Sequence, residues 1–143
     1  MRFVLLFLLL ATPAAAWEFT PTPICTLSHS TDKARLSVTH TPHAVEPYAI
    51  EITQGDAIWG SSPTFQMLFD GPRKLSIATD RHKLGAGGKS LTVTDQGFGN
   101  VLTGLEFNFL ATAKSGDTVL YFPLAGAAEA VQRFRLCAES PEA

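Results

Sequence analysis

The sequence has 143 residues, of which 45% are hydrophobic and 17% are charged, and its formal net charge is −2. A chain of this length forms one domain with one core rather than two. Its charges are scattered, without a basic stripe or a polybasic cluster, which argues against nucleic acid and against anionic membrane surfaces as partners.

The first sixteen residues have the pattern of a secretory signal peptide. Arg2 supplies a positive start, Phe3 to Leu10 is an unbroken apolar run, and Ala14-Ala15-Ala16 offers small residues for cleavage. The apolar run is far shorter than the roughly 20 residues of a membrane span. We therefore expect residues 1–16 to be removed and residues 17–143 to form a single β-rich domain, periplasmic or secreted, with a formal charge of −3.

The next two thirds of the chain have the alternation of short strands. Trp17 to Pro23 contains two prolines and should be extended and irregular. Strands are predicted over 24–29, 35–40, 48–53, 65–69, 75–79 and 90–94, with turn residues between them. The glycines at 85, 87 and 88 suit a hairpin between the last two strands. This regular spacing is typical of a meander or a sandwich.

The last third combines helical and extended patterns. A helix is predicted over 101–113, with Asn100 as its N-cap, Lys114 in its last turn and Gly116 as its terminator. Its apolar positions share one helical face: Val101, Leu102, Leu105 and Phe109. The run Glu106-Phe107-Asn108-Phe109 alternates equally well as a strand, so both alternatives stand.

A strand over 118–124 and a helix over 127–136 complete the chain. Ala130, Val131 and Phe134 give that helix an apolar stripe for docking on a sheet. The predicted fold class is mainly β to α+β, a small antiparallel sheet or sandwich with one or two short C-terminal helices. No cofactor is predicted.

Two cysteines, Cys25 and Cys137, lie near the two ends of the predicted domain. An even count in an exported chain predicts a disulfide. Cys137 follows the last predicted helix, where it would attach that helix to the N-terminal strand.

The segment Gly85-Ala86-Gly87-Gly88-Lys89-Ser90 resembles the end of a phosphate-binding loop. That motif needs a glycine where Lys83 stands and a helix where residues 91–94 favour a strand. We therefore interpret it as a hairpin loop.

Four histidines raise the question of a metal site. His40 and His43 flank Thr41-Pro42, so one loop can aim both at one ion. Zinc normally takes three or four protein ligands, and no spacing here selects the others. Solvated turn histidines are the favoured interpretation, with a metal site at His40 and His43 as the alternative.

Asp80-Arg81-His82 places an acid and an imidazole on either side of an arginine after a strand. On a strand, Asp80 and His82 would share one face, as a base and its orienting carboxylate do. No nucleophile elbow or free cysteine accompanies them, so a surface ion-pair cluster is the favoured interpretation. The sequence therefore predicts a protein that is not an enzyme.

Two other segments are candidates for binding. Trp59 lies between turn signals, where an exposed aromatic side chain anchors partners. Phe98 and Asn100 belong to Asp95-Gln96-Gly97-Phe98-Gly99-Asn100, whose glycines allow the backbone to approach a ligand closely. Structural roles in packing and in a turn are the alternatives.

The C-terminal third also carries a family resemblance. A strand is followed by Pro123-Leu124-Ala125-Gly126-Ala127-Ala128-Glu129-Ala130-Val131, then by Phe134 and Cys137. Residues 97–137 resemble the closing segment of the invasion-associated locus B family of exported α-proteobacterial proteins. The resemblance implies a small sandwich-like fold with a role in host interaction or envelope upkeep, and no catalytic residues.

Together these features favour a non-enzymatic interaction module whose candidate binding residues are Trp59, Asp80, His82, Phe98 and Asn100. Its partner would be an unknown protein or an envelope component, and we expect a monomer or a weak homo-oligomer. The alternative is a periplasmic carrier of a small ligand or a metal that uses His40, His43 and His82.

Overall fold

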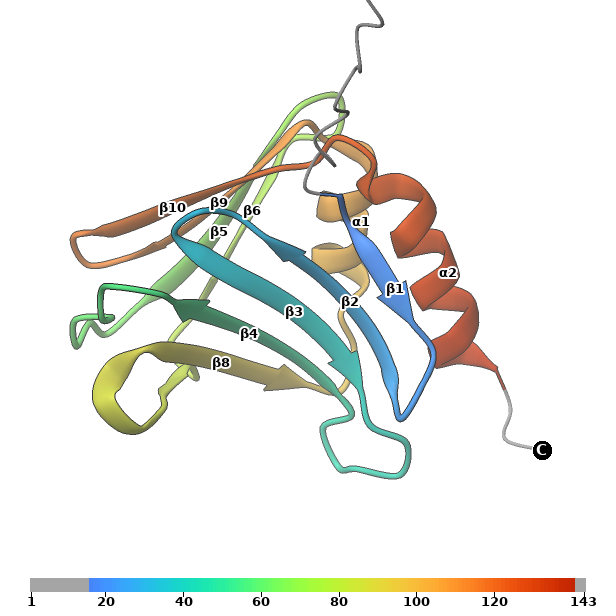
Figure 1. Cartoon of the computed structure of the whole chain (residues 1–143), viewed down its shortest axis with the longest axis horizontal. Coiled ribbons are helices and arrows are strands. Elements are labelled where there is room, and N and C mark those ends of the chain that lie inside the picture. The colour runs from blue at the N-terminus through green and yellow to red at the C-terminus, as the bar shows by residue number, and fades with distance from the viewer. Residues whose placement is uncertain (1–15, 141–143) are drawn as a thin grey trace, which may run out of the picture.

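Two antiparallel sheets face each other in the computed structural model, which describes residues 16–140 (Figure 1). The six-stranded sheet has the order β1-β2-β3-β4-β8-β7, and the four-stranded sheet has the order β10-β9-β5-β6. The first sheet contains β1 (Glu18–Thr20), β2 (Cys25–Ser30), β3 (Ala34–His40), β4 (Tyr48–Gln54), β7 (Lys83–Leu84) and β8 (Ser90–Asp95). The second contains β5 (Phe65–Asp70), β6 (Leu75–Thr79), β9 (Leu110–Ser115) and β10 (Thr118–Pro123).

Two helices lie at one end of this pair of sheets, α1 (Gly99–Phe107) and α2 (Ala127–Glu139) (Figure 1). The second helix packs against β1, β2 and α1, and α1 also contacts β6 and β9. The predicted fold class, an antiparallel β-rich domain with two C-terminal helices and one disulfide, is confirmed.

All seven predicted strands are present, with ends within one residue of those expected. They form because alternate side chains enter the space between the sheets, as Leu27, Leu36 and Ile52 do on neighbouring strands. The irregular segment predicted over 17–23 contains a short strand, β1, which pairs with β2. The glycine loop was expected to join the strands at 75–79 and 90–94, but these belong to different sheets. It joins β7 to β8 instead.

The predicted helix over 101–113 is wrong in its second half. The helix α1 ends at Phe107, and β9 follows as the central neighbour of β5 and β10. Asn108 ends the helix, because its side-chain amide donates to the Gly104 carbonyl at 3.0 Å and to the Arg73 carbonyl at 2.9 Å. The strand alternative over 106–109 is wrong as well, since these residues contain the helix end and its exit.

The boundary residues predicted for that helix have other roles. Phe98, not Asn100, is the N-cap, and no side-chain hydrogen bond caps it. Lys114 is part of β9. Gly116 forms the turn from β9 to β10, with the left-handed φ of 56° that glycine tolerates.

The C-terminal helix is one turn longer than predicted, so Cys137 lies inside α2 rather than beyond it. The predicted Cys25–Cys137 disulfide is confirmed and connects β2 to α2 across 112 residues of sequence. Within residues 16–140 no helix is both long and apolar enough to cross a membrane. The predicted signal peptide falls almost wholly outside these residues and stays a prediction.

Gly104 is the position at which α1 approaches the core most closely. A Cβ atom there would lie 2.5–2.7 Å from ring atoms of Phe69, which is fully buried. Gly104→Ala would stabilise the protein by up to about 1 kcal/mol through helix propensity, and it would destabilise the protein by about 1–3 kcal/mol through overpacking of the core.

We expect overpacking to dominate, with a fall of about 1–2 kcal/mol in the free energy of unfolding, measured by urea titration. Gly99→Ala is the matched control in the same helix, because a Cβ atom at Gly99 meets nothing within 4 Å. An unchanged or raised unfolding midpoint for Gly104→Ala would contradict this close approach.

Candidate functional site

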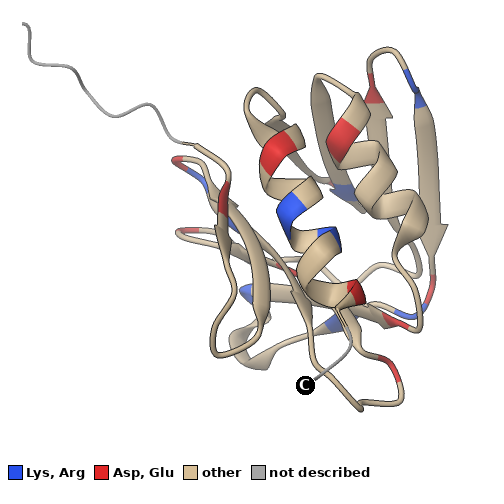
Figure 2. Ribbon diagram, turned by 90° about the vertical axis from the view of Figure 1, so that its right-hand side faces the viewer, with Lys and Arg blue, Asp and Glu red and all other residues tan. Residues whose placement is uncertain are grey.

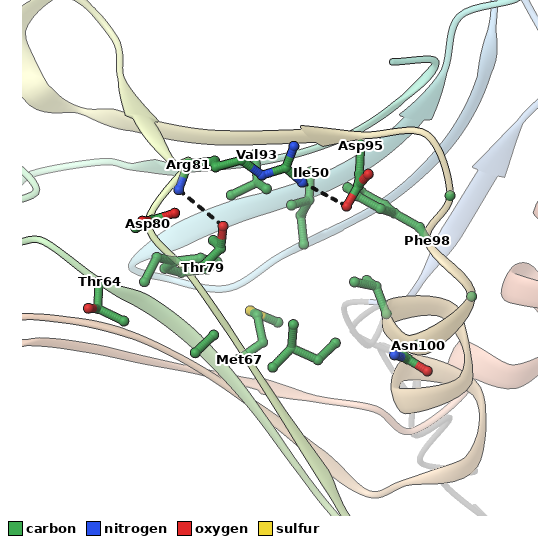
Figure 3. A pocket seen from close by; sticks show the side chains of 16 residues that line it. Ile50, Thr64, Met67, Thr79, Asp80, Arg81, Val93, Asp95, Phe98 and Asn100 are labelled. Carbon is green, nitrogen blue, oxygen red and sulfur yellow. Dashed lines mark hydrogen bonds and ion pairs between the residues drawn. The ribbon is translucent and has the colours of Figure 1, made fainter. Parts of the chain in front are cut away.

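A cleft of about 800 Å³ opens between the two sheets, at the N-terminal end of α1 (Figure 3). One side is formed by β4 and β8 of the larger sheet, and the other by β5 and β6 of the smaller sheet. No strand pairing joins β4 or β8 to β5 or β6, so backbone hydrogen bonds between these strands do not close the space.

The walls of this cleft are apolar because inward-facing positions of paired strands line them. Ile50 of β4 pairs with Val93 of β8, and Met67 of β5 pairs with Ile77 of β6. Figure 3 shows Ile50 and Val93 on one side of the opening and Met67 on the other. The other apolar residues of the lining are Phe65, Ala78, Phe98 and Val101.

Phe98 closes the cleft where β8 leads into α1. Its side chain is 5% exposed, and the Tyr48 ring lies behind it at 5.7 Å between centroids. Tyr48 also contacts Phe134 of α2. Burial raises the pKa of Tyr48 above its ordinary value of 10.0, and the charge of Glu139 raises it further, whereas Arg135 lowers it. The Tyr48 hydroxyl therefore keeps its proton at neutral pH.

Polar and charged groups gather at the mouth: Thr64, Thr79, Asp80, Arg81, Asp95 and Asn100. The Arg81 guanidinium forms ion pairs with Asp95 at 2.9 Å and with Glu46 of the β3–β4 loop at 3.5 Å. Figure 3 shows Arg81 extending over the opening toward Asp95. These side chains are 40–56% exposed, so the pairs contribute little to stability and exchange readily with other partners.

Three of the predicted site residues meet at this cleft, namely Asp80, Phe98 and Asn100. His82 does not line it. One His82 ring nitrogen lies 2.9 Å from the Ser62 carbonyl oxygen, and the centroid of its ring lies 6.3 Å from that of Phe65. The shared face predicted for Asp80 and His82 is absent, because both residues lie in the connection from β6 to β7 rather than on a strand.

The prediction that Trp59 is an exposed anchor is wrong. Trp59 is 2% exposed and packs edge-on against Phe65 at 6.2 Å. Its indole nitrogen donates to the Ile52 carbonyl at 3.1 Å, and its backbone nitrogen donates to the Gly88 carbonyl at 2.7 Å. Trp59 therefore belongs to the core, which is the alternative weighed for it.

His40 and His43 lie apart from the cleft. The His40 ring meets Tyr48 edge-on at 4.8 Å, and His43 sits in the β3–β4 loop with a φ of 67°. Across the described part of the chain, no three or more His, Cys, Asp or Glu side chains are grouped as a metal site requires. The metal alternative thus gains no support here.

The residues that sequence reasoning missed are those that make the cleft. Met67, Ile77 and Val93 have the alternation of core residues, and nothing in that pattern distinguishes a wall from a filled interior. Arg81 was expected in a surface ion-pair cluster with its chain neighbours Asp80 and His82, and its ion pairs are instead with Glu46 and Asp95. Its pairing with Glu46 and Asp95 joins segments 35 and 14 residues away.

Charge on the helical face does not suggest a second site. Figure 2 shows acidic and basic residues interspersed over the helical face, without a broad patch of either sign. The glycine segment at 85–90 leads into strand β8 rather than a helix, as the hairpin interpretation predicted.

No protein-family model matches the sequence, and no curated protein and no solved structure matches it either. The resemblance of residues 97–137 to the invasion-associated locus B family therefore stays a prediction.

Proposed function

We propose that this chain is a non-enzymatic, exported binding protein that holds a small, largely apolar ligand in the cleft between its two sheets. The observation that carries the proposal is the cleft itself. Its volume of about 800 Å³ falls within the roughly 300–1,000 Å³ of small-molecule sites. Apolar walls with a few polar groups at the mouth are the lining such sites use.

This proposal reverses the order of the two functions predicted from the sequence. The interaction module relied on Trp59 as an exposed anchor, and Trp59 is buried. The ligand carrier relied on histidines, but the cleft offers Phe98, Asp80 and Asn100 in their place. We therefore favour the carrier, with a small organic ligand rather than a metal.

The chemistry of the lining supports binding rather than catalysis. Among the described residues, the cleft is lined by no cysteine, serine or histidine. Nucleophilic catalysis needs a nucleophile within hydrogen-bond reach of a base, and His82 does not line the cleft with Asp80. Export is supported by the predicted signal peptide and by the Cys25–Cys137 disulfide, which suits an oxidising compartment.

Filling the cleft is expected to abolish binding. N-phenyl-1-naphthylamine, a neutral apolar dye whose fluorescence rises on leaving water, should bind the purified protein saturably at one site. Ile77→Trp places an indole in the cleft and should weaken that binding by about tenfold or more, since the probe and the side chain would share one volume.

Ser76→Trp is the matched control, because Ser76 is exposed and faces away from the cleft on the same strand. Both variants are first compared with the wild type by thermal unfolding. Saturable binding by Ile77→Trp as tight as that of the wild type, or no binding by the wild type, would refute the proposal.

A further inference from the structure

We propose, on the basis of the proposed function, that the ligand of this cleft carries a positively charged group at one end of an apolar body. The apolar part would lie between Ile50–Val93 and Met67–Ile77, and the charged end would lie at the mouth beside Asp80 and Asp95. The chemical class is a hydrophobic amine or a quaternary ammonium compound.

The charges at the mouth are unbalanced in favour of acid. Asp80 and Asp95 line the cleft with one guanidinium, on Arg81, and a third carboxylate, on Glu46, reaches Arg81 from outside the lining. The local formal charge is therefore −2. A cleft with walls of low polarity and a negative rim attracts cations and repels anions.

Arg81, the one cation among the described residues that line the cleft, is already engaged. Arg81 contacts two carboxylates, so an incoming anion would have to displace Asp95 or Glu46 from it. An incoming cation has no such competition at Asp80. Within residues 16–140, the Asp80 carboxylate forms no ion pair or hydrogen bond with another residue.

One feature of the cleft favours an anion instead of a cation. The N-terminus of α1 borders the cleft at Gly99 and Asn100 and has no side-chain cap. A helix N-terminus carries the equivalent of about half an elementary positive charge, and its effect fades within one turn. This is smaller than the excess of two negative charges, so the preference for a cation survives.

Three probes with the same ten-carbon tail test two questions separately: whether the site exists, and which charge it prefers in a ligand. They are decyltrimethylammonium, decanol and decanoate, each used below its micelle concentration in displacement of N-phenyl-1-naphthylamine. We expect decyltrimethylammonium to bind more tightly than decanoate by about fivefold, with decanol between them. The difference should shrink at high salt, while decanol binding stays constant.

The outcomes distinguish the two proposals. If none of the three probes displaces the dye, the ligand-binding function itself fails. If decanoate or decanol binds as tightly as decyltrimethylammonium, the site stands and the preference for a cation is overturned.

Asp80→Asn tests the residue assigned to the charged group. It should weaken decyltrimethylammonium binding by about two- to fivefold and leave decanol binding unchanged. Asp117→Asn, with the same change of charge in the exposed β9–β10 turn, is the control and should alter neither. Equal affinity of Asp80→Asn and wild type for decyltrimethylammonium would overturn the assignment.

Discussion

Removal of the Cys25–Cys137 disulfide is expected to lower the free energy of unfolding by about 3–5 kcal/mol. The bridge closes a loop of 112 residues, which is most of the folded domain, and so restricts the unfolded chain strongly. Small domains are stable by only about 5–15 kcal/mol, so this loss is a large fraction of the total.

The folded state should nevertheless survive without the bridge. The helix α2 is also held by its buried face, to which Ala130, Val131 and Phe134 contribute, and by the Arg135–Glu106 ion pair at 3.0 Å. The reduced protein should therefore keep its far-ultraviolet circular dichroism while unfolding at lower urea.

The measurement is urea unfolding of the wild type and of Cys25→Ala/Cys137→Ala, each with and without reductant. The wild type should approach the double variant when reductant is added, and the double variant should be insensitive to it. Coincident midpoints of the oxidised wild type and the double variant would contradict a stabilising role for the bridge.

The fold was largely predictable because its determinants are local. Alternation in segments such as Arg35-Leu36-Ser37-Val38 requires one buried face, and a one-residue shift would turn every apolar side chain outward. The disulfide followed from the predicted compartment and an even cysteine count. Assignment of β6 and β8 to different sheets was not predictable, because it depends on which faces meet after the chain has folded.

The error over residues 101–113 has a particular cause. Leu102 and Leu105 do face the core from α1, so the helical period is real over its first two turns. Phe109 continues that period in the sequence but is 73% exposed in the structure. Asn108 diverts the chain by binding the backbone of Gly104 and Arg73, and this contact across 35 residues has no sequence signature.

The candidate site was predictable only in part. Phe98 and Asn100 were recognised through the glycines around them, and Asp80 through its charged neighbours. The walls were not, because a cleft arises where two layers leave space between them, and composition does not record that space. Ile77 has the same local pattern whether it contacts a ligand or another side chain.

Truncation of Trp59 is the second change expected to have a large effect. Trp59→Ala should lower the free energy of unfolding by about 3–5 kcal/mol, the usual cost of deleting a large aromatic side chain from a core. The loss has two parts, because the change empties the space beside Phe65 and leaves the Ile52 carbonyl without the indole donor.

Trp59→Phe helps to separate these parts, since it retains most of the ring volume and removes the hydrogen bond of the indole nitrogen. We expect a loss of about 1–2 kcal/mol for this variant in the same urea titration, well below that of Trp59→Ala. An exposed anchor for a partner would behave differently: Trp59→Ala would then unfold at the wild-type midpoint. The sequence allowed Trp59 to be either a core residue or an exposed anchor, and its 2% exposure supports the core role, so this comparison tests that role directly.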